Sequence, residues 1–404
     1  MGTLIQSEFL VSFKFTLSRL PHIEFGPGSR AVVPDLVAKY GRRVLIVTGS
    51  RSFIEGKHWK TLTEAFAQRD IAWELIQVTG EPSPEMVDRP VLSMAGMGFD
   101  CVLGIGGGSA LDAAKAIAGL LRAGNSVMDH LEGVGPELPY RGPATPFIAV
   151  PTTAGTGSEA TKNAVLSIHG ASGFKKSFRD EKLVAEYAVI DPDLLMSCPP
   201  GVLAANGMDA FTQLLESYVS SKANPFTDAL AYSGMEKVRD ALLPWHEGHG
   251  DGTEHRAAMA YAALLSGITL AQVGLGSVHG LAAPLGAFFP IPHGVVCGTL
   301  VGEATRVNID ALSRRTPDHP ALRKYADAGR LLAGKALSDG EARLALLEIL
   351  DDWTRRLNLP RLGEYGVKEA DVTRIVANSR GSSMKTNPIE LSDMEIAGIV
   401  RARL

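Results

Sequence analysis

The chain has 404 residues and is 45% hydrophobic and 21% charged, a composition typical of a compact globular protein rather than a disordered one. Its length exceeds that of a typical single core, so we expect two domains. Forty Lys and Arg residues against 44 Asp and Glu residues give a net charge of -4 with no clustered basic stripe, which argues against nucleic acid as a partner.

Cysteine use and the first residues both bear on where the protein works. Cys101, Cys198 and Cys297 are odd in number, far apart and outside any C-x-x-C pattern, so we expect neither a disulfide framework nor a thiolate zinc site. A reducing, cytoplasmic setting fits best. The first twenty residues carry Glu8 and Lys14 where a signal peptide would need apolar residues, so we interpret them as a loose tail leading into a strand.

The first half of the chain alternates between strand and helix patterns. Short apolar or β-branched runs occur at 44–49, 100–108, 146–153 and 187–192, separated by segments with helical spacing such as 60–70 and 111–123. This alternation predicts a parallel sheet with helices on its faces, as in a Rossmann-like α/β dinucleotide-binding domain. Such sheets bind ligands at the carboxyl ends of their strands, so the cofactor is expected on the following loops.

After residue 200 the strand pattern stops, and the sequence from about 202 to 404 is helical in character. Pro199, Pro200 and Gly201 mark the change, so we predict an α/β domain at 1–200 and an all-helical domain at 201–404. Residues 257–302 contain no Asp, Glu, Lys or Arg, but Gly267, Gly274, Gly276 and Gly280 break the stretch, and it carries Gln272, His279 and His293. We therefore predict helices buried in a soluble core and no membrane span.

A glycine-rich segment at 104–118, GIGGGSALDAAKAIA, combines a strand end with a helix start. Gly106, Gly107 and Gly108 would let backbone N–H groups approach a pyrophosphate, and the helix N-terminus adds partial positive charge. Ser109 caps that helix or donates to a phosphate oxygen. The segment is neither a strict G-x-G-x-x-G motif nor a P-loop, and a simple tight turn is the alternative.

A second loop, PTTAGTGSEAT at 151–161, places several hydroxyl groups after an apolar strand. Thr152, Thr153, Thr156 and Ser158 are suited to a ribose, a phosphate or a nicotinamide amide. The alternative is that they satisfy local turn hydrogen bonds. Two such loops in one sheet favour a nucleotide site.

The residues after the first apolar strand bear on the choice of cofactor. Dinucleotide folds commonly place an acidic residue there to accept from the ribose 2′-OH, whereas NADP sites leave the position uncharged and offer a nearby Arg. Gly49, Ser50 and Arg51 occupy this place, which favours NADP, with NAD still open. A solvated Arg in an ordinary turn is the alternative.

A candidate metal site comes from the helical half. If 206–218 is a helix, Asp209 and Gln213 lie four residues apart on one face, about 6 Å apart at their Cβ atoms. His279 and His293 lie in the segment without charged residues, where buried polar groups need partners. An Asp oxygen, two imidazoles and an amide oxygen suit Zn²⁺ or Fe²⁺. A helix cap for Asp209 and core packing for each histidine are the alternatives.

These motifs together resemble one known family. GGGSALDAAKAIA, PTTAGTGSEAT, AVIDP, MDAFTQLLESYVS and HGLAAPLGAFFPIPHG, in this order, are similar to the iron-containing, or group III metal-dependent, alcohol dehydrogenases. The resemblance implies a dehydroquinate synthase-like architecture, with a divalent metal in the cleft between the domains. It also implies reversible hydride transfer between a nicotinamide and a small alcohol or aldehyde, and a homodimer or larger homo-oligomer.

Carried over by motif, the resemblance assigns roles to residues of both halves. Asp209, His279 and His293 match metal ligands, and Gly49 stands where NAD-preferring members often have Asp. The resemblance places the glycines, Ser109 and Asp112 at the cofactor phosphates, and around the rest of the dinucleotide it places Thr152, Thr153, Thr156, Asn163 and Lys175.

Two positions depart from the family pattern. Gln213 and Ala283 stand where histidines are usual, so Gln213 would be a weaker ligand and Ala283 removes a side-chain proton relay. Proton exchange would then use water or a ribose hydroxyl. A metal-independent reductase similar to maleylacetate reductases is the first alternative. A nucleotide-binding protein with a structural metal and no redox chemistry is the second.

Overall fold

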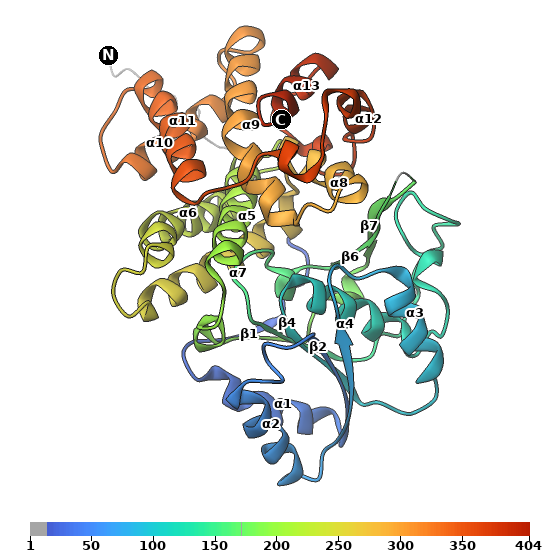
Figure 1. Ribbon diagram of the computed structural model, residues 1–404. Helices are drawn as coiled ribbons and strands as arrows, with labels where there is room; N and C mark the ends of the chain where they lie inside the picture. Colours follow the sequence, from blue (N-terminus) through green and yellow to red (C-terminus); the bar gives the residue numbers. More distant parts are fainter. Residues whose placement is uncertain (1–13, 171) are drawn as a thin grey trace, which may run out of the picture.

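The computed structural model describes residues 14–170 and 172–404, so most of the predicted N-terminal tail, residues 1–13, lies outside the described residues. Before residue 200 the chain forms a sheet covered by helices, and after it the described chain is helical (Figure 1). The predicted boundary at residue 200 coincides with the start of α5, which begins at Pro200, after β8 has ended at Ile190.

A six-stranded sheet organises the first half. Its strand order is β1-β8-β5-β4-β2-β3, and every neighbouring pair is parallel, as predicted from the alternating pattern. The strands are β1 (His22–Phe25), β2 (Arg43–Gly49), β3 (Ala72–Val78), β4 (Cys101–Gly106), β5 (Phe147–Pro151) and β8 (Tyr187–Ile190).

Helices cover both faces of this sheet. Side chains alternate along β2, so Leu45 and Val47 pack in one apolar cluster with residues of α3 and α4, while Val44 and Ile46 pack in another with α1 and α2. β4 and β5 are buried along their whole length, which explains why their sequences are continuous apolar runs. These helices are α1 (Val33–Tyr40), α2 (Lys57–Ala67), α3 (Pro84–Ser93) and α4 (Gly108–Leu120).

Three strands of this half were missed by the sequence pattern. β3 is an edge strand whose outer residues are exposed, so Glu74 and Gln77 interrupt its apolar character. β6 (Asn163–Ile168) and β7 (Phe174–Arg179) form a separate antiparallel hairpin, which carries Lys175 and other polar residues because it lies beside the cleft rather than in the sheet.

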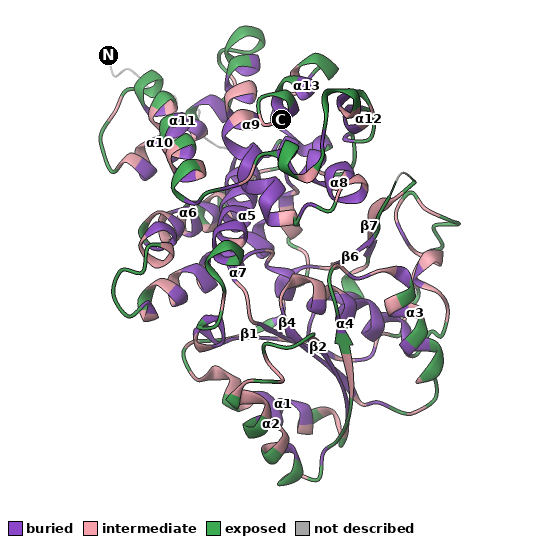
Figure 2. Ribbon diagram, viewed as in Figure 1, coloured by how far each residue is buried: buried purple, intermediate pink, exposed green. Residues whose placement is uncertain are grey.

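The helical half is built around α5, whose residues from Met208 onward are buried (Figure 2). One helix of the described chain, α7, is long and apolar enough to cross a membrane, but 67% of its apolar window is buried against the rest of the protein, as in a core helix. The helices of this half are α5 (Pro200–Val219), α6 (Pro225–His246), α7 (Thr253–Val273), α8 (Ser277–Phe288), α9 (His293–Arg315), α10 (Pro320–Ala333), α11 (Asp339–Arg356), α12 (Val372–Ala377) and α13 (Asp393–Arg401).

Candidate active site

The loops after β2, β4 and β5 meet at the carboxyl edge of the sheet. The backbone N–H of Thr152 donates to the Gly106 carbonyl at 2.9 Å, and a Cβ added at Gly106 would lie 3.3 Å from the Gly49 nitrogen. The predicted cofactor residues of these three loops therefore form one continuous surface, which we call the glycine edge: Gly49, Gly106, Gly107, Gly108, Thr152, Thr153 and Thr156.

Close packing explains the glycines in this edge. A Cβ at Gly107 would lie 3.2 Å from Thr153 Oγ1, and one at Gly108 would lie 2.7 Å from Thr156 Oγ1. The threonine loop thus rests directly on the backbone where α4 begins. Glycine at 107 and 108 lets the two loops meet and leaves the N-terminus of α4 beside the cavity described below, where an anion is favoured.

A buried ionic network holds the loop between β5 and β6. Lys115 on α4 is fully buried and donates to the Ser158 carbonyl at 2.8 Å, to Thr161 Oγ1 at 2.9 Å and to the Asn163 carbonyl at 2.8 Å. Asp112 accepts from Ser158 Oγ and from the Val165 N–H, so both of its oxygens have protein partners. Sequence reasoning missed Lys115; its signal was a single lysine within residues 113–120 of α4, which are otherwise apolar.

Other predicted cofactor residues occupy varied settings. Lys175 on β7 forms an ion pair with Glu81 at 2.5 Å. Burial raises the pKa of the Glu81 carboxyl, but Lys175 outweighs burial and holds it below its usual value. Ser50 and Arg51 are exposed, and with Gly49 they lie outside the lining of the cavity in the described part of the chain.

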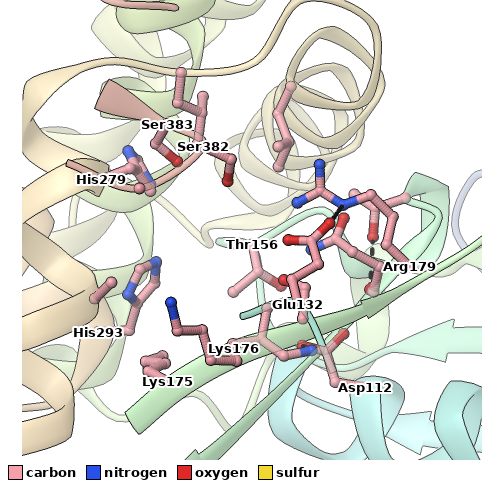
Figure 3. Close-up of a pocket in the computed structure, with 18 of the residues that line it drawn as sticks. Asp112, Glu132, Thr156, Lys175, Lys176, Arg179, His279, His293, Ser382 and Ser383 are labelled. Carbon is pink, nitrogen blue, oxygen red and sulfur yellow. Dashed lines mark hydrogen bonds and ion pairs between the residues drawn. The ribbon is translucent and has the colours of Figure 1, made fainter. Parts of the chain in front are cut away.

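A cavity of about 530 Å³ joins the sheet edge to the helical half, a volume in the range of small-molecule sites (Figure 3). His279 and His293 lie on one side and Asp112 and Arg179 on the other, with Thr156 between them. The cavity brings predicted cofactor and metal residues together: its lining includes Gly108, Ser109, Asp112, Thr156, Asn163, Lys175, Gln213, His279 and His293.

The predicted metal residues converge from three helices. Asp209 lies on α5, His279 on α8, and His293 is the first residue of α9. Asp209 Oδ1 is 3.3 Å from His279 Nε2 and 3.7 Å from His293 Nε2. Side chains about 70 positions apart thus point at one spot beside the cavity.

Glu216 and Cys297 are two further side chains that sequence reasoning missed. Glu216, seven residues after Asp209 on the same helix, bonds to His279 Nδ1 at 2.7 Å and accepts from the Val278 N–H at 2.7 Å, which fixes the orientation of the imidazole. Cys297 Sγ lies 3.5 Å from His279 Nε2 and 3.7 Å from His293 Nε2. Neither residue carried a local sequence signal, because each role depends on how α5, α8 and α9 pack together.

The cluster has the properties of a cation site. Among the described residues, the buried Asp209 Oδ2 has no hydrogen-bond partner, although the Asp209 side chain is only 1% exposed. Burial raises the pKa of Asp209, but the His293 and His279 imidazoles outweigh burial and hold it below its usual value. Burial lowers the pKa of His293 to about 4. Ionised Asp and neutral His are the forms that bind metals, so Asp209 and His293 are already in their metal-binding forms. Burial lowers the pKa of His279, but Cys297, Asp209 and Glu216 outweigh burial and hold that pKa well above its usual value, so a bound ion must displace a proton from this imidazole. The donor types fit a divalent ion.

Comparisons with known proteins agree with this geometry. The sequence model for iron-containing alcohol dehydrogenase matches residues 21–192, and the model for the C-terminal part of that family matches residues 203–404. Alcohol dehydrogenase 4 of Saccharomyces cerevisiae is 31% identical over 93% of this chain and 95% of its own length. The NAD-dependent methanol dehydrogenase of Bacillus methanolicus is 32% identical over 76% of this chain and 77% of its own length.

A solved structure extends the likeness to three dimensions. The crystal structure of an archaeal alcohol dehydrogenase from a Red Sea brine pool superposes with a TM-score of 0.87 at 25% identity, covering 97% of this chain and 99% of that one. The predicted fold and oxidoreductase activity are confirmed. The chain belongs to the iron-containing alcohol dehydrogenase family, whose members are metal-dependent alcohol dehydrogenases and aldehyde reductases.

Proposed function

We propose that this enzyme prefers NADP(H) and interconverts a small alcohol and its aldehyde, with a divalent metal, Fe²⁺ or Zn²⁺, held by Asp209, His279 and His293. The observation that carries this proposal is the single cavity lined both by the start of α4 and by the two histidines. A nicotinamide ring and a metal-bound substrate can meet only in a space that both sites share.

The glycine edge is proposed to bind the dinucleotide. The backbone of Gly106, Gly107 and Gly108 and the N-terminus of α4 offer N–H donors to the pyrophosphate, and Ser109 adds a hydroxyl. Asp112 lines the same cavity, but its oxygens accept from Ser158 and Val165, so we assign it to holding the loop rather than to a direct phosphate contact. The proposal places the remainder of the cofactor against Thr152, Thr153, Thr156, Asn163 and Lys175.

The helical half is proposed to carry the chemistry. A bound metal supplies Lewis-acid polarisation of the substrate oxygen. Asp209, His279 and His293 hold it, and Glu216 keeps His279 turned toward the cluster. Ala283 lines the cavity without a proton-carrying group, so proton exchange does not pass through residue 283.

A chelation experiment tests the metal requirement. NADPH-dependent reduction of a panel of short aldehydes is measured before chelation, after chelation, and after separate addition of Fe²⁺ and Zn²⁺, with elemental analysis of each sample. We expect chelation to abolish activity and one of the two ions to restore it. Full activity in protein shown to be metal-free would instead favour the metal-independent reductase type.

The cofactor preference is tested at Gly49. A Cβ added there meets no atom within 4 Å, so Gly49→Asp can be introduced without a clash. The new carboxylate should accept from a ribose 2′-OH and repel a 2′-phosphate, so the ratio of kcat/KM for NADPH to that for NADH should fall by about 10- to 100-fold. Gly49→Asn, which has the same size without the charge, is the control. An unchanged ratio in Gly49→Asp would contradict the NADP preference.

We further propose that the two domains are residues 1–200 and 201–404, that the protein is a homodimer or larger homo-oligomer, and that it works in the cytoplasm. Light scattering of the purified protein tests the oligomeric state. A monomer at micromolar concentration would contradict it.

A further inference from the structure

Cys297 lies inside the cluster of candidate metal ligands. It is on α9, four residues after His293, and is fully buried. One ligand atom each from Asp209, His279, His293 and Cys297 all lie within 4.8 Å of one another. The cysteine is therefore part of the same convergence of side chains and not a neighbour behind it.

Four of the six separations between these atoms lie within about 0.4 Å of the edges of a tetrahedral zinc site. With Zn–S at about 2.3 Å and Zn–N or Zn–O at about 2.0–2.1 Å, tetrahedral geometry places S and N about 3.5 Å apart and N and O about 3.3 Å apart. Cys297 Sγ is 3.5 Å from His279 Nε2 and 3.7 Å from His293 Nε2. Asp209 Oδ1 is 3.3 Å from His279 Nε2 and 3.7 Å from His293 Nε2.

Gln213, the amide that sequence reasoning placed in the ligand set, is engaged elsewhere. Its Oε1 accepts from Ser266 Oγ at 2.8 Å, and its Nε2 donates to Asp209 Oδ1 at 3.4 Å. In this arrangement the amide oxygen faces α7, and the amide nitrogen, which cannot bind a cation, faces the carboxylate. Gln213 thus supports Asp209 from the position where the family usually has a histidine ligand.

We infer that Cys297 is the fourth protein ligand of the metal, bound as a thiolate beside Asp209, His279 and His293, in place of Gln213. The inference rests on the proposed function for the presence of the metal and adds a thiolate that the sequence interpretation had excluded. With four protein ligands in place, the substrate oxygen must enter as a fifth ligand. Binding releases the thiol proton to solvent as the metal–sulfur bond forms. A thiolate donor shifts the preference of the site toward Zn²⁺ relative to an all-oxygen and nitrogen set.

X-ray absorption of the zinc-loaded wild-type enzyme tests the bond directly. We expect a sulfur scatterer at about 2.3 Å in addition to nitrogen and oxygen at about 2.0–2.2 Å. In the cobalt-loaded enzyme we expect a near-ultraviolet sulfur-to-cobalt charge-transfer band. Cys297→Ser should lose this band and bind zinc at least about tenfold more weakly, since it loses the thiolate.

The controls separate this inference from the proposed function. Cys198→Ser removes a half-buried thiol outside the cluster and should leave the band and the zinc affinity unchanged. Gln213→Leu should retain the sulfur scatterer. An enzyme that reduces aldehydes with zinc bound but shows only nitrogen and oxygen scatterers would overturn the role of Cys297 and leave the proposed function standing. Because the scattering measurement uses the wild-type protein, it does not depend on how well Cys297→Ser folds.

Discussion

The glycine edge and the metal cluster reach the same cavity, the edge through Gly108 and Thr156 and the cluster through His279 and His293, but they are built in opposite ways. The edge is made of three short segments, each at the end of a strand or directly after it, and it offers mainly backbone donors held by close packing, as at Gly108 against Thr156. The cluster is made of side chains from α5, α8 and α9, brought together by the helical core. Backbone recognition leaves a local motif in a sequence, whereas a site assembled from distant side chains leaves only scattered residues.

Removing the negative charge of Asp209 from the metal cluster should cause the largest loss of activity. Asp209→Asn preserves the shape of a side chain that is 1% exposed but removes the anion that faces both imidazoles. We expect kcat/KM for aldehyde reduction to fall by at least about 10³-fold, because stabilisation of the substrate oxygen depends on the bound ion. Steady-state kinetics with saturating added metal measure this loss.

Thermal unfolding separates loss of metal from loss of fold in this variant. Wild-type protein should melt at higher temperature when Zn²⁺ is present, because the ion binds the folded state. Asp209→Asn should melt cooperatively but without that increase. An equal metal-dependent increase in both proteins would contradict the assignment of Asp209 as a ligand.

A methyl group added in the glycine edge should weaken cofactor binding and leave metal binding unaffected. In Gly108→Ala the new Cβ would lie 2.7 Å from Thr156 Oγ1, so the threonine loop must move away from the start of α4. We expect KM for NADPH to rise by about 10- to 100-fold, since the donors at the helix N-terminus lose their alignment. Zinc content should be unchanged.

Gly340→Ala on α11 is the matched control for this change. It also adds one methyl group to a helical glycine, but the new Cβ meets no atom within 4 Å. Its kinetics should equal those of the wild type, and its stability should rise slightly because Ala favours helices. If Gly108→Ala bound NADPH as tightly as this control, the edge would not be the cofactor site.

This contrast explains how far the sequence could predict the structure. The parallel sheet was predictable because β4 and β5 are buried runs between helical patterns, and the edge was predictable because its glycines are consecutive. Asp209, His279 and His293 stood out as polar residues in apolar helices. Glu216 and Cys297 did not, because their roles depend on how α5, α8 and α9 cross, and α9 brings Cys297 toward His279 only after packing.

The loop between β5 and β6 joins the glycine edge to the metal cluster. Its buried glutamate, Glu159, allows the smallest and most specific test of this connection. Gly157 in this loop packs against Gly267 of α7, and the neighbouring Glu159 is 3% exposed. Burial raises the pKa of Glu159 to about 7 from 4.5, despite the opposing effect of Lys115. The folded protein therefore binds a proton that the unfolded chain has lost, and the free energy of unfolding should decrease as pH rises from about 4.5 to about 7.

Glu159→Gln should remove that decrease, because the amide stays neutral in both states. Relative to the wild type, the variant should gain stability through this pH window and level off above pH 7 at about 3 kcal/mol, as measured by urea unfolding at a series of pH values. Glu348→Gln, an exposed position on α11, should show no such pH-dependent gain. Zinc affinity and the KM for NADPH should be unchanged in Glu159→Gln, since the carboxyl belongs to the connection and to neither binding region. A gain that is the same at every pH would mean that Glu159 is ionised in the folded protein, and that the loop between the glycine edge and the metal cluster pays no electrostatic penalty for its burial.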